Sequence, residues 1–134
     1  MFKVESLAPM LQVFDMPRAV VFYRDVLEFE VVATSPARSN DDSDWGLLRR
    51  DGMELMLNAS YEHDERPAAP DPARIAAHDD TAIFFACREL DAIYAHLRAH
   101  GVEANEPAVA YYGMKQIWLK GSRRLCDLLS VARR

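Results

Sequence analysis

The hydrophobic positions near the start of the chain change from a strand spacing to a helix spacing and back. Four apolar residues recur at the i, i+3, i+4, i+7 spacing of one helix face: Ala19, Phe22, Tyr23 and Val26. Asp15 precedes this run and can accept hydrogen bonds from the free amides of a helix with Pro17 in its first turn. The pattern predicts a helix over 16–28 between strands near 6–13 and 29–35.

The same order of elements is predicted twice along the chain. The first copy continues with strands at 44–50 and 53–58. The second copy has predicted elements at 81–87 (strand), 88–100 (helix), and 101–106, 112–119 and 125–131 (strands). Its helix carries apolar residues at the same spacing as the first: Leu90, Ile93, Tyr94 and Leu97. We therefore predict one α+β domain over 1–134, with two βαβββ modules at about 5–58 and 81–131.

The segment between these modules, at about 59–80, has a different composition. Pro67, Pro70 and Pro72 stand among alanine and charged residues. Proline restricts the backbone and interrupts regular pairing, so this composition predicts an extended linker.

Asp51 and Gly52 predict a tight hairpin, because both residues can take the positive φ angles of a type I′ turn. A two-residue turn fixes the pairs: Arg50 with Met53, Arg49 with Glu54, Leu48 with Leu55, Leu47 with Met56, and Trp45 with Asn58. Since alternate side chains point to opposite faces, one face carries Leu48, Leu55 and Leu57 towards the helix. The same alternation places Leu11 and Val13 towards the helix. The other face is predicted to carry Ala8, Met10, Gln12, Trp45, Leu47, Arg49, Glu54, Met56 and Asn58.

The composition of the chain indicates which kinds of binding partner and which location to expect. The chain has 134 residues, half of them hydrophobic, and a formal charge of −5 with the two signs interspersed. A chain of this length can bury a hydrophobic core. Its charged residues form no basic cluster that would bind nucleic acid or an anionic membrane. The most apolar run, 81–87, is too short to span a bilayer, and the charged N-terminal segment does not look like a secretory signal. We expect a cytoplasmic protein in which Cys87 and Cys126 are reduced thiols.

These segments resemble the vicinal oxygen chelate superfamily, which includes glyoxalases, bleomycin-resistance proteins and extradiol dioxygenases. The family motif Ala-x-x-Phe-Tyr-x-x-x-Leu-Gly-Phe stands here as Ala19–Phe29, with Glu28 in place of the glycine. The resemblance continues through Trp45–Leu48, Asp51–Leu57, Leu90–His100, Gly101–Val102 and Tyr112–Met114. It implies a curved sheet around a cleft, and a left-handed, mildly strained backbone at Glu28.

The resemblance also implies where a metal would be held. Metal-dependent members use His, Gln or Glu at four strand positions, which fall here on Ala8, Glu54, Ala82 and Leu128. One carboxylate cannot supply the coordination of a tight divalent site, so we expect no metal and no cofactor. The match is therefore nearest to the metal-free bleomycin-resistance branch.

Titratable residues give weak indications of catalysis. Glu54 is a candidate metal ligand or general base, but Arg49 across the hairpin can pair with it and leave it structural. His96 and His100 lie four apart on a helix face that we expect to be solvated. His63 and His78 lie in or beside the linker, and His78 could reach the rim of the cleft.

A set of aromatic, methionine and polar side chains is predicted to line the cleft. Its members are Met10, Gln12, Trp45, Arg49, Glu54, Met56, Asn58, Phe84, Tyr112, Met114, Gln116 and Trp118. For Met10 and Phe84, packing in the core is an equal alternative. Flat aromatic faces favour a planar or cationic ligand, and the acidic net charge favours a basic one.

The leading hypothesis is a protein that sequesters a small aromatic or amphipathic molecule without chemical change, as a homodimer of the bleomycin-resistance type. The alternatives are a metal-dependent lyase or dioxygenase of the glyoxalase type, and a metal-free isomerase or lyase with Glu54 as general base.

The C-terminal sequence departs from the family. Members usually enter their last strand through Asp-Pro-Asp-Gly-Tyr, whereas this chain reads Gly-Ser-Arg-Arg-Leu-Cys-Asp-Leu over 121–128. Codons for Asp-Pro-Asp-Gly-Tyr-Ala-Ile-Cys, read one base out of register after an extra G, can give this run. We hypothesise a frameshift, natural or from cloning. The restored reading places Cys at the fourth ligand position.

Overall fold

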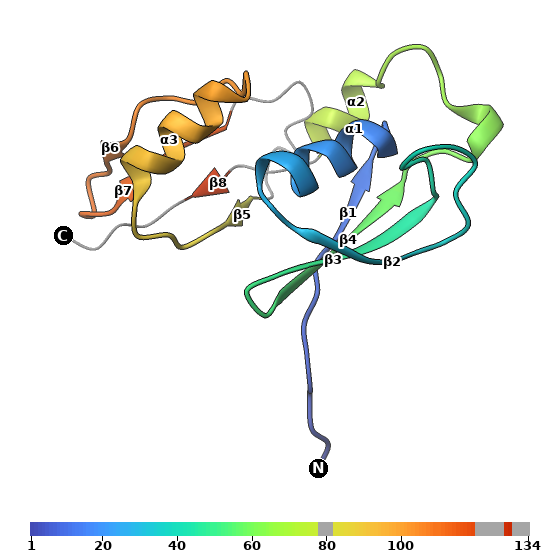
Figure 1. The fold of residues 1–134 in the computed structure, drawn as a ribbon, viewed down its shortest axis with the longest axis horizontal. Coiled ribbons are helices and arrows are strands. Elements are labelled where there is room, and N and C mark those ends of the chain that lie inside the picture. The colour runs from blue at the N-terminus through green and yellow to red at the C-terminus, as the bar shows by residue number, and fades with distance from the viewer. Residues whose placement is uncertain (78–81, 120–127, 130–134) are drawn as a thin grey trace. The chain divides into compact units, whose positions relative to one another are not determined.

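The computed structural model describes residues 1–77, 82–119 and 128–129. The chain forms two compact units, Met1–Ala69 and Pro70–Arg134 (Figure 1). Each unit combines short helices with strands, which confirms the α+β prediction.

Unit 1 is built on a four-stranded mixed sheet of order β1-β4-β3-β2. Its strands are β1 (Met10–Val13), β2 (Glu30–Thr34), β3 (Trp45–Arg50) and β4 (Met53–Ala59). β1 pairs with β4 in parallel, and the other two pairs are antiparallel. The apolar residues of its core are Leu11, Val13, Met16, Val20, Tyr23, Leu27, Phe29, Leu48, Leu55 and Leu57.

The helix of unit 1 begins where the sequence predicts. α1 (Met16–Val21) is capped by Asp15, whose Oδ1 accepts from the Arg18 N–H at 3.2 Å, and it continues as the π-helical turn η1 (Phe22–Val26). The predicted end at residue 28 is two residues too late, because Glu28 takes a φ of 61° and turns the chain towards β2.

β1 is shorter than predicted, since residues 1–9 form no strand and are mostly exposed. Pro9 accounts for its start at Met10, because it has no N–H to donate to the parallel pairing with β4.

The β3–β4 hairpin confirms the predicted register from Arg50–Met53 through Trp45–Asn58. Asp51 and Gly52 have φ angles of 50° and 79°, as a type I′ turn requires. Leu48, Leu55 and Leu57 are buried, so the predicted inner face packs as expected.

Unit 2 contains α2 (Pro72–Ala77), β5 (Ile83–Phe84), α3 (Leu90–Ala99), β6 (Ala108–Val109), β7 (Lys115–Gln116) and β8 (Leu128–Leu129). β5 pairs with β8 in parallel, and β6 pairs with β7 antiparallel. Leu90 and Leu97 of α3 are buried, as are Ile117 and Leu119. The predicted helix over 88–100 is therefore confirmed to within two residues at each end.

Three strands predicted in unit 2, at 81–87, 101–106 and 112–119, are longer than the observed ones. Of 112–119, only Lys115 and Gln116 form a strand, β7. Of 81–87, only Ile83 and Phe84 form a strand; residue 81 lies outside the described part. The strand predicted over 101–106 is reduced to a single bridge from Ala104 to Leu119, and β6 was not predicted. Of 125–131, the structure describes only the two residues of β8.

The linker prediction is wrong at α2. Asp71 Oδ1 accepts from the Ala73 N–H at 2.9 Å, and the Asp71 carbonyl accepts from the Ile75 N–H at 3.1 Å. Pro72 occupies the first helical position, where its missing N–H costs nothing and its φ favours the helix. The proline that indicated an extended segment therefore starts a helix. Another short helix, η2 (His63–Glu65), also lies in the predicted linker.

Glu28 gives a stability prediction. Its side chain makes one exposed ion pair with Arg50 at 3.4 Å, which contributes little, whereas its positive φ strains any residue with a Cβ. Glu28→Gly should therefore raise the free energy of unfolding by about 1 kcal/mol in urea denaturation. Glu30→Gly is the matched control: Glu30 is exposed in β2, so the same change there should destabilise. Equal effects at both positions would contradict the strain at Glu28.

Candidate functional site

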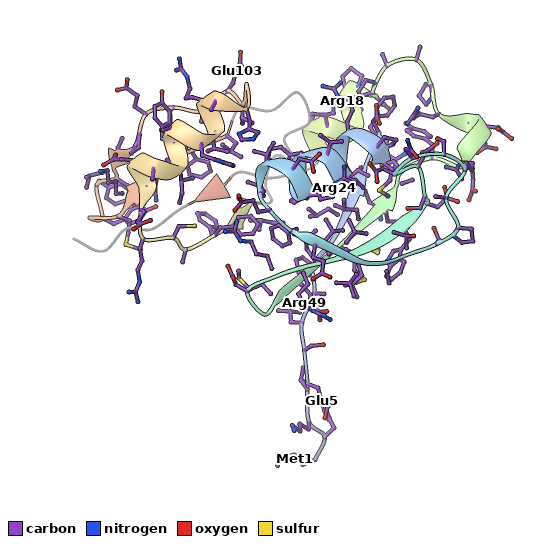
Figure 2. All side chains as sticks on the ribbon, in the orientation of Figure 1. Met1, Glu5, Arg18, Arg24, Arg49 and Glu103 are labelled. Carbon is purple, nitrogen blue, oxygen red and sulfur yellow. The ribbon has the colours of Figure 1, made fainter. Side chains whose placement is uncertain are left out.

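The outer sheet face of unit 1 is the face of β1, β4 and β3 that the inner leucines do not occupy. It carries the eight side chains predicted there, with Ala8 just before β1: Met10, Gln12, Trp45, Leu47, Arg49, Glu54, Met56 and Asn58. Most are half-buried, and Met10 and Arg49 are exposed. In Figure 2, Arg49 lies on the opposite side of β3 from the helix residues Arg18 and Arg24. Met10 is therefore exposed, which contradicts the alternative that it packs in the core.

Arg49 and Glu54 are paired across the hairpin. Nη2 and Nε of Arg49 donate to Oε2 of Glu54 at 2.7 and 3.2 Å. The Glu54 side chain is mostly shielded and that of Arg49 is about half exposed. The predicted pairing is confirmed, and it neutralises the Glu54 carboxylate. Oε1 of Glu54 has no hydrogen-bond partner among the described residues.

A second polar pair lies at the other end of this face. Asn58 Nδ2 donates to Gln12 Oε1 at 3.1 Å and to the Ala59 carbonyl at 3.3 Å. The parallel register places Gln12 beside Asn58, and the hairpin places Trp45 on the other side of Asn58. One hydrogen bond therefore links the two amide groups beside an aromatic ring.

The loop over 36–44 is held to the helical side of unit 1 by Arg24. Its guanidinium donates to Asp25 at 2.9 Å and to Asp41 at 2.8 Å. These hydrogen bonds, that of Asp25 first, raise the pKa of Arg24 above its usual value, so the side chain stays charged. At the far end of the loop, Arg38 pairs with Asp44 at 2.9 Å. No residue of this loop was predicted as a site residue.

Unit 2 gathers four predicted site residues into what we call the aromatic cluster: Phe84, Tyr112, Gln116 and Trp118. The Phe84 and Trp118 rings meet edge to face, with centroids 6.0 Å apart and planes at 76°. Trp118 Nε1 donates to Gln116 Oε1 at 3.3 Å, and Gln116 Nε2 donates to the Tyr112 hydroxyl oxygen. The exposed fractions of Phe84, Tyr112 and Trp118 are 57%, 51% and 37%, so these rings are not core residues.

Tyr111 and Met114 are near Tyr112 in the sequence. Met114 is half-buried in the turn between β6 and β7, where its carbonyl accepts from the Ala110 N–H at 2.7 Å. Tyr111 is fully exposed and contacts the Tyr112 ring edge to face, with centroids 5.0 Å apart. Sequence reasoning missed Tyr111; its signal was the Tyr-Tyr-Gly turn between two short strands.

The family's metal positions do not supply a ligand set. Ala8, Ala82 and Leu128 have no donor atoms in their side chains, and Glu54 is engaged by Arg49. Within the described residues, no group of three or more His, Cys, Asp or Glu side chains is placed to hold a metal ion. The donor chemistry at these positions therefore does not fit a divalent ion.

None of the four histidines stands at one of these four positions in the sequence. His96 lies on α3 and His100 is the residue at its C-terminal cap. Their ring centroids are 4.3 Å apart, and His100 Nδ1 lies 2.9 Å from the His96 carbonyl oxygen. His100 is exposed, as predicted, and His96 is half-buried. His63 lies in η2, and His78 lies outside the described residues. Among the described helices, none is long and apolar enough to cross a bilayer.

Comparisons with solved structures show the fold. A bleomycin-binding protein from bleomycin-producing Streptomyces verticillus, complexed with copper(II)-bleomycin, has a TM-score of 0.65 at 17% identity, with 100% of both chains covered. A superfamily member from Sphaerobacter thermophilus DSM 20745 has a TM-score of 0.67 at 20% identity, covering 97% of this chain and 98% of that one. The fosfomycin resistance protein FosX from Listeria monocytogenes, complexed with Mn(II) and sulfate, has a TM-score of 0.64 at 16% identity, covering 98% and 93%.

These similar structures include a protein that binds an antibiotic complex and a protein that holds Mn(II), so the fold alone does not choose between binding and metal-dependent chemistry. Among curated proteins, no sequence matches the chain. The sequence profile of the Glyoxalase/Bleomycin resistance protein/Dioxygenase superfamily matches residues 6–118. Because that match covers most of the chain, this protein belongs to the glyoxalase/bleomycin resistance protein/dioxygenase superfamily.

Proposed function

We propose that this protein binds a small planar aromatic or amphipathic molecule without a metal and without changing it chemically. The observation that carries the proposal is the aromatic cluster, in which Phe84, Tyr112 and Trp118 are held together by ring contacts and hydrogen bonds yet remain largely accessible. Accessible aromatic faces with a few polar groups suit stacking on a flat ligand. The outer sheet face, with Trp45 and Met56, supplies further apolar surface in unit 1.

The absence of donor atoms at three family ligand positions supports the metal-free part of the proposal. A tight divalent site needs several oxygen, nitrogen or sulfur donors, and these positions offer only Glu54, which Arg49 already pairs. We further propose that the two predicted modules, about 5–58 and 81–131, are repeats of one βαβββ unit. We also propose that the protein is a homodimer, since closed twofold pairing is the commonest form of self-association.

The metal-free proposal is tested by Glu54→Gln, which keeps size and removes the charge. The purified protein should contain no stoichiometric divalent metal by elemental analysis. Adding Mn, Ni, Zn or Fe should not raise its melting temperature, and Glu54→Gln should bind naphthalene within about twofold of the unaltered chain, because stacking does not involve the carboxylate. Arg49→Gln is the matched control, because it breaks the same ion pair but keeps the Glu54 carboxylate.

A stoichiometric metal that is lost in Glu54→Gln would contradict the proposal and favour the glyoxalase-type or dioxygenase-type enzyme.

A second candidate function is a metal-free isomerase or lyase in which Glu54 is the general base. The observation that favours it is that Oε1 of Glu54 has no hydrogen-bond partner among the described residues. Turnover of a bound compound by the unaltered chain but not by Glu54→Gln would establish that function instead.

The ligand itself can be sought by mass spectrometry of small molecules released when the protein, purified without denaturation, is unfolded. The proposal predicts an aromatic or amphipathic compound near one per chain. Reproducible release of a purely aliphatic polar compound would contradict the stacking role of the aromatic cluster.

A further inference from the structure

Gln116 joins two accessible aromatic side chains from beneath. Gln116 is only 6% exposed, whereas Tyr112 and Trp118 reach the surface of unit 2. The amide uses both of its ends, because Nε2 donates to the Tyr112 hydroxyl oxygen and Oε1 accepts from Trp118 Nε1. A buried side-chain amide with both ends engaged holds its partners in a defined arrangement.

The direction of these hydrogen bonds is set by the indole group. Trp118 Nε1–H can only donate, so the oxygen of the Gln116 amide must face it. The NH₂ end of the same amide then faces Tyr112, and an NH₂ group can only donate. The Tyr112 oxygen is therefore the acceptor in its bond with Gln116. Its own hydroxyl proton must point in another direction.

That proton has no acceptor among the described residues, and Tyr112 is about half exposed. The Trp118 and Phe84 rings belong to the same cluster and are accessible. A flat ligand stacked on this cluster would therefore meet aromatic surface together with one free O–H donor. The group that best complements such a donor is a hydrogen-bond acceptor in the plane of the ligand.

We propose that Gln116 is a positioning residue that fixes the Tyr112 hydroxyl as a donor towards the ligand, and that the ligand is a planar aromatic molecule carrying a hydrogen-bond acceptor. This inference rests on the proposed function and adds the polarity of the ligand to it. Gln116 stays a predicted residue of the cleft, and its burial gives it a role that acts through Tyr112 and Trp118.

Quinoline and naphthalene are the two probes that test this polarity. They have nearly the same shape, but quinoline carries a ring nitrogen that accepts a hydrogen bond. Equilibrium dialysis at pH 8 should show quinoline bound about fivefold more tightly than naphthalene, as one neutral hydrogen bond allows. Tyr112→Phe removes only the hydroxyl group and should bring the two affinities together by weakening quinoline alone.

Two further variants separate the role of Gln116 from a general disturbance. Gln116→Glu keeps the size, and its ionised carboxylate can only accept, so the Tyr112 proton should turn inward and the preference for quinoline should disappear. Tyr111→Phe removes the neighbouring, fully exposed hydroxyl and should keep the preference. Naphthalene affinity should stay within about twofold in all three variants, since no stacking surface is removed.

The outcomes separate this inference from the proposed function. If the unaltered protein binds both probes equally, or if Tyr112→Phe or Gln116→Glu keeps the preference, the donor role is wrong while aromatic binding stands. If the unaltered protein binds neither probe, the proposed function itself is contradicted.

Discussion

Leu57→Ala should lower the free energy of unfolding by about 3 kcal/mol, the loss typical of a leucine deleted from a packed core. Leu57 is 0% exposed and lies in β4, which pairs with β1 on one side and β3 on the other. The deletion would leave a cavity on the inner face among residues fixed by the sheet register, where collapse is restricted. Urea denaturation followed by circular dichroism measures the change.

Leu7→Ala is the matched control for this loss. Leu7 precedes β1 and is 88% exposed, so the same substitution should change stability by less than about 0.5 kcal/mol. Similar losses at the two positions would mean that the inner face of unit 1 is not the core described above.

Trp118→Ala should weaken binding of both naphthalene and quinoline by about tenfold or more. The indole contributes stacking surface, contacts Phe84 edge to face and completes the hydrogen-bond chain through Gln116 to Tyr112. Stacking of a flat ring on an aromatic side chain contributes about 1 to 3 kcal/mol, and one decade corresponds to 1.4 kcal/mol. Equilibrium dialysis of both probes measures the loss.

Phe2→Ala is the control for Trp118→Ala, because it also removes an exposed aromatic ring, but from the N-terminal segment of unit 1. It should leave both affinities unchanged, and circular dichroism should show both variants folded. Equal weakening by Phe2→Ala and Trp118→Ala, or no weakening by Trp118→Ala, would contradict a binding role for the aromatic cluster.

The sequence predicted unit 1 well because its signals are local and strong. Asp15 caps a helix at the expected residue, and the Asp51–Gly52 turn fixes every pair of the hairpin. Once the turn length is known, the alternation of side chains places Arg49 against Glu54 without further information. The strain at Glu28 could also be predicted, since the family motif carries glycine at this position. The positive φ of Glu28 confirms that prediction.

The bounds of the elements were predicted less well in unit 2, where strand pairing depends on residues far apart in the sequence. β5, β6 and β7 of unit 2 are two residues long, and hydrophobic alternation cannot tell where pairing stops. Proline was interpreted as extended around Pro72, although a preceding Asp71 gives the same residue a favourable place at a helix start. Capping and proline position together, rather than proline content, would have predicted α2.

The predicted site residues are brought together within each unit by their strands and turns. Asn58 with Gln12, Arg49 with Glu54, and Trp118 with Phe84 are all adjacent pairs. The set as a whole stays a prediction. The burial of Gln116 and the direction of its hydrogen bonds could not be predicted from the sequence, because they depend on which side chains lie above it.

The frameshift near the C-terminus stays a hypothesis. The family match ends at residue 118, just before the run that departs from the family pattern, and residues 120–127 lie outside the described part. Sequencing the coding DNA tests the hypothesis: it is rejected if no run of bases there encodes Asp-Pro-Asp-Gly-Tyr in the neighbouring frame.

We propose that aromatic surface, and no metal ion, holds the ligand. Equilibrium dialysis of quinoline against the purified protein, before and after treatment with a chelator such as EDTA, tests this proposal. We predict saturable binding near one molecule per chain, with the same affinity in both preparations. Binding that disappears after chelation and returns on adding a divalent ion, or no saturable binding in either preparation, would contradict the claim.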